Sequence, residues 1–399
     1  MSRPEEFKNK TIILGVQIDD LSLTQVMEKV DHFLHSEKQM RIFTPNPEIC
    51  LKAADDDEYR HVLNNAELCI PDGFGLKLGA KIFGEKLINR VTGVDLTKAI
   101  LDKYQKEEKG IRVYILTLDI SLTKKSDLEQ LFKQKYSNIQ FRNSIVTKED
   151  YLNCDKNLND ILEFAPQIIF VCLGAPRQEI WISKYLKTLS SVKIALGVGG
   201  TFDFFTGKIK RAPEILRKLG MEWFYRLYQE PKRLNRIKNA TADFLLKCHE
   251  WDKRIKTTMR TNVVGIIRNK EDKYLIQKNA YLENHWQFPQ GGVDTDEQPE
   301  QSIVREASEE LGIESKFLKV IKKLPGQHEY ISPRYAQLLH GYRGQSQTAF
   351  LLNFNGTDQD INLTKSHEVE KIKWVGKSEI LESLHPIRRD FARKLIPYL

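Results

Sequence analysis

Three carboxylates at helical spacing are the most specific chemical signal in this sequence. Glu306, Glu309 and Glu310 stand at positions i, i+3 and i+4, so on an α-helix they share one face. Carboxylates this close repel one another unless a divalent cation lies between them, and Mg²⁺ and Mn²⁺ prefer oxygen ligands. Such an ion can hold the phosphate oxygens of a substrate and generate a hydroxide nucleophile. The three residues therefore predict a divalent-metal site that could hydrolyse a phosphate-containing substrate.

The carboxylates belong to a longer pattern that runs from Gly291 to Ile313. It reads GGVDTDEQPEQSIVREASEELGI and follows G-x5-E-x7-R-E-U-x-E-E-x-G-U without exception, where U is aliphatic. Arg305, on the flank of the helix, is placed to pair with Glu297 and fix the loop before it. A solvent-exposed helix rich in Glu would not explain the matches outside the three carboxylates. We expect structural roles for the four other matching residues, Gly291, Glu297, Arg305 and Gly312.

This pattern resembles the Nudix hydrolase family, and the resemblance covers nearly all of residues 260–399. It implies that Glu306, Glu309 and Glu310 bind Mg²⁺ or Mn²⁺. It also implies that one of them, or a neighbouring carboxylate, polarises the attacking water, with Glu309 and Glu310 as the catalytic candidates. The strands and the helix around the pattern are then those of an α+β Nudix fold.

Two flanking segments narrow the resemblance to one branch of that family. HWQFPQGG before the pattern and YRGQSQTAFLL after it are similar to bacterial RNA pyrophosphohydrolases and dinucleoside-polyphosphate hydrolases. By this resemblance we expect Gln345 and Gln347 to contact the substrate, and Glu368 to add a metal-binding or catalytic carboxylate. The implied substrate is an RNA 5′ end or a dinucleoside polyphosphate, and a nucleotide sugar stays open.

Residues 11–200 alternate short apolar runs with amphipathic stretches. This α/β pattern predicts a doubly wound, Rossmann-like parallel sheet with helices on both faces. Helical spacing marks residues 23–34, 100–107 and 126–136. The expected buried strands are TIILGV, MRIFT, ELCIP, RVYILT, QIIFVCLG and KIALGVGG. Ligands of such sheets bind at the carboxyl ends of the strands, so we expect a site in the loops that follow them.

These loops offer polar groups. TPNPE carries the hydroxyl of Thr44 and the amide of Asn46, and IPDGFG holds Asp72 on a tight turn. LGAPRQEI places Arg177 and Gln178 where a helix begins, and a helix N-terminus favours phosphate. Each loop alone is a weak signal, because such turns often carry Gly, Asp and Asn for structural reasons.

Taken in order, the loops resemble the TagA/WecG/CpsF glycosyltransferases (glycosyltransferase family 26). RVTGVDL, GVGGTFDFFTGKIKRAP and LGMEWFYRLYQEPKRLNR also match, and the resemblance covers residues 10–240. It implies inverting transfer of N-acetylmannosamine, or a related aminosugar, from a UDP-sugar to a polyprenyl-diphosphate-linked N-acetylglucosamine. By the same resemblance Asp72 is the general base. Thr44, Asn46 and Gln178 then line the sugar and acceptor pocket.

The net charge of +8 is concentrated in one stretch. Between residues 201 and 260, 15 Lys and Arg stand against 7 Asp and Glu. This excess suits an anionic membrane surface or a phosphate-rich ligand, although an ordinary solvated helix face also fits. By resemblance, Arg226, Arg233 and Arg236 belong to an appendage that closes over the active site and presses against the membrane. There they would neutralise a diphosphate, so we expect no cofactor in this half and a peripheral location on the inner face of the cytoplasmic membrane.

The composition argues against several classes of protein. With 41% hydrophobic and 29% charged residues, the chain has no apolar run of a length that spans a bilayer, which takes roughly 18–20 residues. The polar start, MSRPEEFKNK, does not resemble a secretory signal, and a cytoplasmic protein is expected. Five scattered cysteines without CxxC spacing favour free thiols over disulfides or a zinc site.

A change of pattern near residues 250–260 divides the chain. We predict a Rossmann-like glycosyltransferase domain at 1–205, a basic helical appendage and linker at 206–257, and a Nudix hydrolase domain at 258–399. The segment TLDISLTKKS follows RVYIL, where the transferase family usually has a Gly-rich turn. The absence of that turn argues against glycosyltransferase activity. The alternative is therefore an amino-terminal module that binds a ligand or the membrane without catalysis and localises an active hydrolase. A homo-oligomer also stays open.

Overall fold

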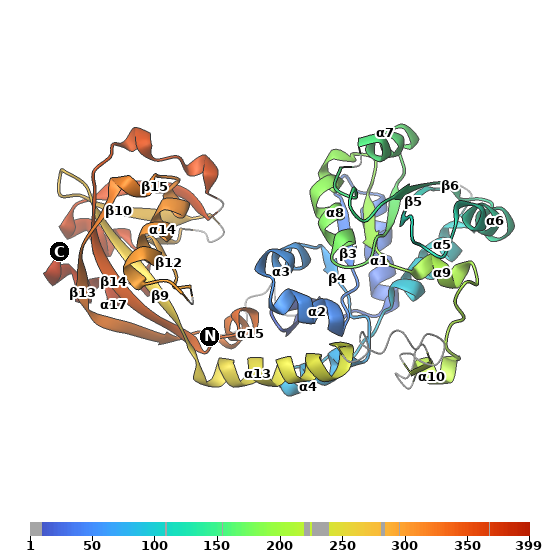
Figure 1. Cartoon of the computed structure of the whole chain (residues 1–399), viewed down its shortest axis with the longest axis horizontal. Coiled ribbons are helices and arrows are strands. Elements are labelled where there is room, and N and C mark those ends of the chain that lie inside the picture. Colours follow the sequence, from blue (N-terminus) through green and yellow to red (C-terminus); the bar gives the residue numbers. More distant parts are fainter. Residues whose placement is uncertain are drawn as a thin grey trace. The chain divides into compact units, whose positions relative to one another are not determined.

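The computed structural model describes residues 10–107, 110–153, 155–218, 224–225, 239–280, 284–294, 296–366 and 368–399. The chain forms two compact units (Figure 1). The first contains Met1–Lys253 and Pro333–Gly341, and the second contains Arg254–Ser332 and Tyr342–Leu399. Each unit is built on its own large sheet.

A six-stranded parallel sheet forms the centre of the first unit, in the order β4-β3-β8-β7-β5-β6. Its strands are β3 (Met40–Phe43), β4 (Leu68–Cys69), β5 (Arg112–Leu118), β6 (Gln140–Val146), β7 (Ile168–Cys172) and β8 (Ile194–Gly197). The helices that accompany it are α1 (Leu23–Leu34), α2 (Pro47–Ala54), α3 (Asp57–Asn64), α4 (Gly75–Ile82), α5 (Gly93–Tyr104), α6 (Lys125–Lys135), α7 (Asp155–Phe164), α8 (Arg177–Tyr185) and α9 (Thr201–Phe205). This architecture confirms the predicted parallel sheet.

The strands show why helices cover both faces of this sheet. In β5, Val113 and Ile115 belong to the hydrophobic cluster that also holds side chains of α1, α5 and α6. Tyr114, between them, points to the opposite face, where its hydroxyl donates a hydrogen bond of 2.5 Å to Asp160 of α7. All three side chains are buried, which accounts for the continuous apolar run in this strand.

Two elements of the first unit differ from the sequence prediction. TIILGV does not form one strand of the sheet, because β1 (Lys10–Ile13) and β2 (Val16–Asp19) pair antiparallel in a separate two-stranded sheet. The chain reverses at Leu14 and Gly15, which have φ angles of 50° and 79°. No apolar run indicates β6, because most side chains of this edge strand are half-exposed.

Among the described residues, three further α-helices belong wholly or mainly to the first unit. They are α10 (Glu214–Lys218), α13 (Phe244–Thr257) and α15 (Arg334–His340). Helix α13 packs closely on α4, since a Cβ at Gly79 would lie 2.7 Å from the Phe244 ring. Helix α15 comes from the Pro333–Gly341 segment. It is held by a hydrogen bond of 3.1 Å from Trp251 Nε1 to the Leu338 carbonyl.

A seven-stranded mixed sheet forms the second unit, in which β9 and β14 pair in parallel and the other pairs are antiparallel. Its strands are β9 (Met259–Arg268), β10 (Tyr274–Asn279), β11 (Trp286–Gln287), β12 (Gln290–Gly292), β13 (Leu318–Ile331), β14 (Gly344–Phe354) and β15 (Val369–Val375). Helix α14 (Pro299–Leu311) covers one face. Helices α16 (Ile380–Ser383) and α17 (Pro386–Leu395) cover the other. This is the predicted Nudix-type α+β fold.

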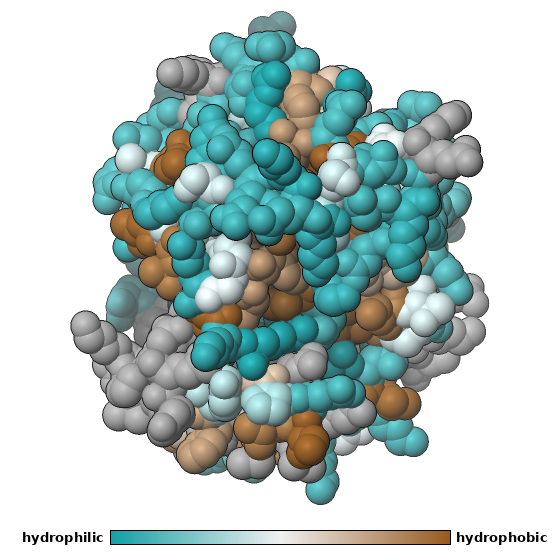
Figure 2. All heavy atoms as spheres, turned by 90° about the vertical axis from the view of Figure 1, so that its right-hand side faces the viewer, coloured by the Kyte–Doolittle hydropathy of each residue, from teal (hydrophilic) through white to brown (hydrophobic). Residues whose placement is uncertain are grey.

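Among the described residues, no helix combines the length and apolar character that a membrane span requires. The face shown in Figure 2 is mainly hydrophilic, with hydrophobic side chains in separate small groups. Large hydrophobic side chains that remain exposed in the first unit include Phe74 and Leu78 at α4, and Leu246 on α13.

Candidate functional sites

A cavity of about 230 Å³ lies at the carboxyl ends of β3, β4, β7 and β8 in the first unit. Its walls come from the loops and helix starts that follow these strands. They include four residues predicted from the sequence, Thr44, Asn46, Asp72 and Gln178. Residues that are distant in the chain meet here because the carboxyl ends of parallel strands share one edge of a sheet.

Asp72 follows β4 in the turn that forms one wall of the cavity. Its N–H donates to the carbonyl of Pro45 at 2.8 Å, and Gly73 follows with a φ of 117°. The Asp72 carboxylate accepts a hydrogen bond of 3.3 Å from the N–H of Gly93, the first residue of α5. The turn and the positive end of this helix thus hold the carboxylate at the cavity.

Thr44 and Asn46 lie in the loop between β3 and α2. Thr44 is buried, and its hydroxyl donates to the Gly197 carbonyl at 3.4 Å. Asn46 is the N-cap of α2, where its Oδ1 accepts a hydrogen bond of 3.0 Å from the Ile49 N–H. The side-chain oxygen of Asn46 therefore serves the helix, and its amide nitrogen is the group left for a ligand.

The described walls of the cavity carry negative charge. Glu48, Asp72 and Asp203 line it, and no Lys or Arg is found among the lining residues that the structure describes. A bound nucleoside diphosphate would need cationic groups from beyond these walls. The three arginines predicted for that task lie outside the described residues; they are Arg226, Arg233 and Arg236.

The segment after β5, which lacks the Gly-rich turn of the family, is anchored by side-chain hydrogen bonds. The N–H and hydroxyl of Thr123 both donate to Asp203 Oδ1, at 3.0 and 2.7 Å. The same hydroxyl lies 3.0 Å from that of Thr206. None of residues 117–126 is among the described residues that line the cavity. The cavity wall is thus built from other loops, and Asp203 links this segment to it.

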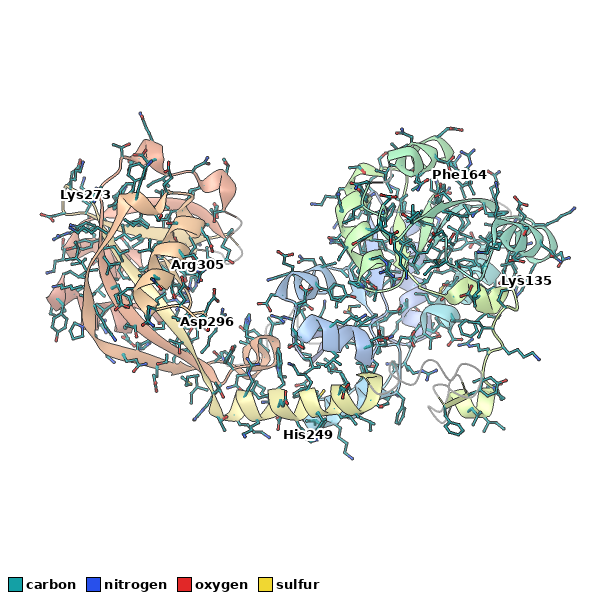
Figure 3. All side chains as sticks on the ribbon, viewed as in Figure 1. Lys135, Phe164, His249, Lys273, Asp296 and Arg305 are labelled. Carbon is teal, nitrogen blue, oxygen red and sulfur yellow. The ribbon has the colours of Figure 1, made fainter. Side chains whose placement is uncertain are left out.

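In the second unit, Arg305 of α14 is the centre of an ion-pair network. Arg305 and Asp296, both labelled in Figure 3, lie on α14 and in the loop before it. The guanidinium pairs with Glu297 at 3.0 Å, Glu306 at 3.0 Å and Glu309 at 3.4 Å. Hydrogen bonds from Arg305 lower the pKa of Glu297. Arg305 therefore ties the loop to the helix face that carries the carboxylates.

The two glycines near the ends of the pattern permit close approaches between backbone and neighbouring atoms. A Cβ at Gly291 in β12 would lie 1.9 Å from Cδ of Glu306, so the absence of a side chain lets this carboxylate rest against the strand. Gly312 ends α14 with a φ of 63°, and a Cβ there would lie 2.0 Å from the carbonyl oxygen of Asn362. Both glycines thus have a steric reason to be present.

The three carboxylates of α14 occupy different environments. Glu310 is buried, whereas the Glu309 side chain is 64% exposed. Glu310 Oε2 accepts a hydrogen bond of 3.0 Å from the Gln290 N–H. Burial raises the pKa of Glu310 to about 8, against the lowering effect of hydrogen bonds from Gln277 and Gln290. Burial also raises the pKa of Glu306, against the lowering effect of its pair with Arg305.

These groups suit a hard divalent cation. Among the described residues, no three His, Cys, Asp or Glu side chains stand close enough together to hold an ion without adjustment. Glu368 nevertheless raises the pKa of both Glu306 and Glu310, so the three carboxylates interact and a cation between them would relieve their repulsion. Their oxygen donors fit Mg²⁺ or Mn²⁺.

Gln345 and Gln347 of β14 take part in a hydrogen-bond network within the sheet. Gln345 Oε1 accepts from the Tyr330 hydroxyl at 2.7 Å and from Asn262 Nδ2 at 3.2 Å. Gln347 is buried, and its Nε2 donates to Gln290 Oε1 at 3.0 Å. The network joins β14 to β12 at Gln290, the residue whose N–H binds Glu310.

Several residues at the first cavity were not singled out by the sequence reasoning. Glu48 and Asp203 line it, and Arg211 forms an ion pair of 2.7 Å at the first turn of α5. Glu179 is fully buried beside Gln178. All four belong to segments that carry the transferase resemblance. Their place in those segments was the available signal, and the sequence did not show that Asp203 and Glu179 are buried.

Two family models match the chain. The glycosyl transferase WecG/TagA/CpsF family matches residues 11–258, and the NUDIX domain matches residues 258–398. Both resemblances predicted from the sequence are thereby confirmed, and the first match covers more than half of the chain.

Individual proteins also match parts of this chain. N-acetylglucosaminyldiphosphoundecaprenol N-acetyl-beta-D-mannosaminyltransferase of Staphylococcus aureus is 30% identical over 251 residues, which are 62% of this chain and 95% of the relative. The Bacillus subtilis enzyme of that name is 33% identical over 218 residues, 54% of this chain and 81% of the relative. Among solved structures, a C. elegans Ap4A hydrolase binary complex is 22% identical, covering 35% of this chain and 97% of that chain with a TM-score of 0.29. The chain belongs to the glycosyl transferase WecG/TagA/CpsF family and carries a NUDIX domain over residues 258–398.

Proposed function

We propose that the first unit transfers N-acetylmannosamine, or a related N-acetylaminosugar, from a UDP-sugar to a polyprenyl-diphosphate-linked N-acetylglucosamine. The curated relatives are, by name, mannosaminyltransferases for N-acetylglucosaminyldiphosphoundecaprenol. The observation that carries the proposal is the position of Asp72, whose carboxylate lines a cavity at the carboxyl ends of the strands. Thr44, Asn46 and Gln178 share that cavity and supply the polar contacts that a sugar requires.

In this mechanism Asp72 is the general base. Its carboxylate takes the proton from a hydroxyl of the acceptor sugar while that oxygen attacks the anomeric carbon of the donor. The bond from this carbon to the diphosphate oxygen breaks, UDP leaves, and attack from the opposite side inverts the configuration. Charge-assisted hydrogen bonds from three arginines stabilise the leaving diphosphate in place of a metal ion. The arginines are Arg226, Arg233 and Arg236.

The test uses the full chain with a chelator, so that metal-dependent hydrolysis of the donor is suppressed. A lipid-linked N-acetylglucosamine acceptor is incubated with a panel of UDP-aminosugars, and the lipid product is identified by mass spectrometry. A product one N-acetylaminosugar heavier supports the proposal. Binding of UDP or of the lipid diphosphate without transfer from any donor would refute it and favour a non-catalytic module that localises the hydrolase.

We propose for the second unit hydrolysis of a pyrophosphate linkage in an RNA 5′ end or a dinucleoside polyphosphate. The NUDIX family generally uses divalent metal ions, and an ion bound here would polarise the phosphate and activate water. Glu309 or Glu310 takes the proton of the attacking water, and Gln345 and Gln347 orient the substrate. The residues that would hold Mg²⁺ or Mn²⁺ are Glu306, Glu309, Glu310 and Glu368.

A substrate panel tests this second activity. The full chain is given RNA with a 5′-triphosphate, dinucleoside polyphosphates and UDP-sugars, each with Mg²⁺, with Mn²⁺ and with a chelator. Metal-dependent release of pyrophosphate or of a nucleotide from one of the first two classes supports the assignment. Cleavage of UDP-sugars alone would move the substrate to nucleotide sugars, and cleavage that persists in chelator would contradict a metal-bound site.

The organisation follows from these roles. We propose a transferase domain at 1–205, a basic appendage at 206–257 and a hydrolase domain at 258–399.

The acceptor of the proposed transfer is a membrane lipid, and residues 201–260 hold the basic excess of the chain. A peripheral position on the inner face of the cytoplasmic membrane would bring that basic segment to anionic lipid headgroups.

A further inference from the structure

A fully buried carboxylate lies beside the cavity of the first unit. Glu179, in the first turn of α8, has a relative exposure of 0%. Its Oε1 accepts a hydrogen bond of 2.7 Å from Gln178 Nε2, and its Oε2 accepts one of 3.1 Å from the Tyr59 hydroxyl. Burial raises the pKa of Glu179, and both hydrogen bonds counter that rise. Burying such a group is costly, so a role beyond packing is expected.

Two partners fix the orientation of the Gln178 amide. The Gly199 N–H donates to Gln178 Oε1 at 2.9 Å. A backbone N–H cannot accept a hydrogen bond, so the carbonyl oxygen of Gln178 must face Gly199. The NH₂ group then faces Glu179 Oε1, which accepts whether or not the carboxyl carries a proton on the oxygen near Tyr59. The neighbouring strand leaves room, because a Cβ at Gly197 would lie 2.9 Å from Gln178 Nε2.

This orientation decides what a ligand meets in the cavity. Gln178 lines the cavity with Asp72 and Thr44. One hydrogen of its NH₂ group bonds to Glu179, and no other described residue accepts the second. That second N–H is a donor held in a fixed direction. Its partner in a bound ligand must be an acceptor atom.

We propose that Glu179 is a positioning residue of the transferase site, which holds the Gln178 amide so that its remaining N–H binds an acceptor oxygen of the sugar substrate. The inference rests on the proposed transferase function, because it takes the ligand to be the sugar of the donor or the acceptor. Glu179 does not touch the ligand. It acts through Gln178, and the loss of its acceptor oxygen would let the amide turn away from the ligand.

Two substitutions at position 179 test this role in the full chain. Glu179→Met keeps a similar volume and removes the acceptor, and we expect KM for one substrate to rise about tenfold with kcat nearly unchanged, as for a lost neutral hydrogen bond. Glu179→Gln restores an acceptor toward Gln178, and its NH₂ can donate to the Tyr59 oxygen. We expect this conservative variant to recover KM to within about threefold of the wild type.

Tyr59→Phe is the matched control. It removes the hydrogen bond to the other oxygen of Glu179 and leaves the one to Gln178. We expect a smaller rise in KM than for Glu179→Met. An effect of Tyr59→Phe as large as that of Glu179→Met would indicate that the whole buried cluster supports the fold, and would overturn a specific action through Gln178.

A double-mutant cycle with Gln178→Met separates positioning from general destabilisation. Once Gln178 is absent, Glu179→Met should raise KM no further, so the two effects are strongly non-additive. Additive effects, or an unchanged KM in Gln178→Met or Glu179→Met, would overturn the inference. Equilibrium binding of both substrates and thermal unfolding are measured on the same proteins. A wild-type chain that transfers no sugar refutes the proposed function, whereas unchanged substrate affinity in Glu179→Met refutes the positioning role.

Discussion

Asp72 owes its position to local geometry on both sides of a single turn. Its backbone is tied to Pro45, Gly73 adopts a φ that favours glycine, and the Gly93 N–H donates to its carboxylate. The N-terminus of α5 thus lies against this carboxylate, where a helix favours negative charge. In the proposed mechanism the same carboxylate takes the proton of an acceptor hydroxyl that enters the cavity.

Replacing Asp72 by Asn tests this role at the level of one atom. The amide has almost the same shape but cannot take a proton at neutral pH. We therefore expect transfer to slow by roughly 10²–10⁴-fold while UDP-sugar affinity stays nearly unchanged. Steady-state kinetics and equilibrium binding give the two numbers. Asp57→Asn, at a carboxylate with 78% exposure in the same unit, is the control. An Asp72→Asn enzyme as fast as this control would remove Asp72 from the chemistry.

Glu309 gives the corresponding test in the hydrolase. Its side chain is largely exposed, so Glu309→Gln should leave the unfolding temperature unchanged. Because the substitution would remove a charged group from the proposed metal site, we expect at least about a tenfold loss of metal-dependent hydrolysis. Glu314→Gln, another exposed carboxylate of this unit, should keep full activity. Equal hydrolysis by the two variants would contradict the assignment of Glu309.

Four residues that the sequence predicted for one site, Thr44, Asn46, Asp72 and Gln178, line one cavity in the structure, because the carboxyl ends of parallel strands share an edge. Their roles stay predictions. The sequence did not show that Asn46 Oδ1 caps α2 or that Gln347 is buried in a network with Gln290. Such partners come from other elements, and the order of residues along one segment contains no information about them.

At the level of elements, the hydrolase site depends on the contact between β12 and α14. Gly291 is the point of closest approach, and Arg305 ties the loop between the two elements to the helix. Both features serve the position of Glu306. The residues of the pattern therefore serve packing as well as the proposed metal binding.

Gly291→Ala should damage this contact selectively. The added Cβ would meet Cδ of Glu306 at 1.9 Å, and the flexible carboxylate has to move. We expect hydrolysis to fall at least about tenfold, as for displaced metal ligands, with little change in unfolding temperature. Gly376→Ala is the matched control, because a Cβ there would come no closer than 3.3 Å to another group. Full activity in Gly291→Ala would show that Glu306 need not lie against β12.

The elements that the sequence predicts best are those with strong periodicity. Residues 23–34 were expected to be helical, and α1 spans the same residues, because a capping Ser22 and a regular apolar stripe mark both its start and its buried face. The β1–β2 hairpin was missed because one turn at Leu14 and Gly15 divides a continuous apolar run. The edge strand β6 was missed because most of its side chains are half-exposed, so its segment contains no continuous apolar run.

At the scale of the whole chain, the basic segment sets an expectation for membrane binding. Residues 201–260 hold the entire net charge of +8, and each Lys or Arg near an anionic surface contributes about 1 kcal/mol. Sedimentation with vesicles that contain anionic lipid should fall as salt rises, and should be weak with neutral vesicles. Replacing Arg226, Arg233 and Arg236 together by Gln should lower the sedimented fraction below that of the wild type at the same salt concentration. Salt-independent sedimentation would contradict this electrostatic account.

The central claim is that one chain carries two separate chemistries, and crossed variants measure it most directly. Transfer to lipid-linked N-acetylglucosamine and hydrolysis of RNA 5′ ends or dinucleoside polyphosphates are assayed on the same preparations of wild type, Asp72→Asn and Glu309→Gln, with metal and with chelator. We predict that Asp72→Asn loses only transfer, and that Glu309→Gln and the chelator abolish only hydrolysis. Absence of either activity from the wild type, or loss of both activities in one variant that remains folded, would contradict the account.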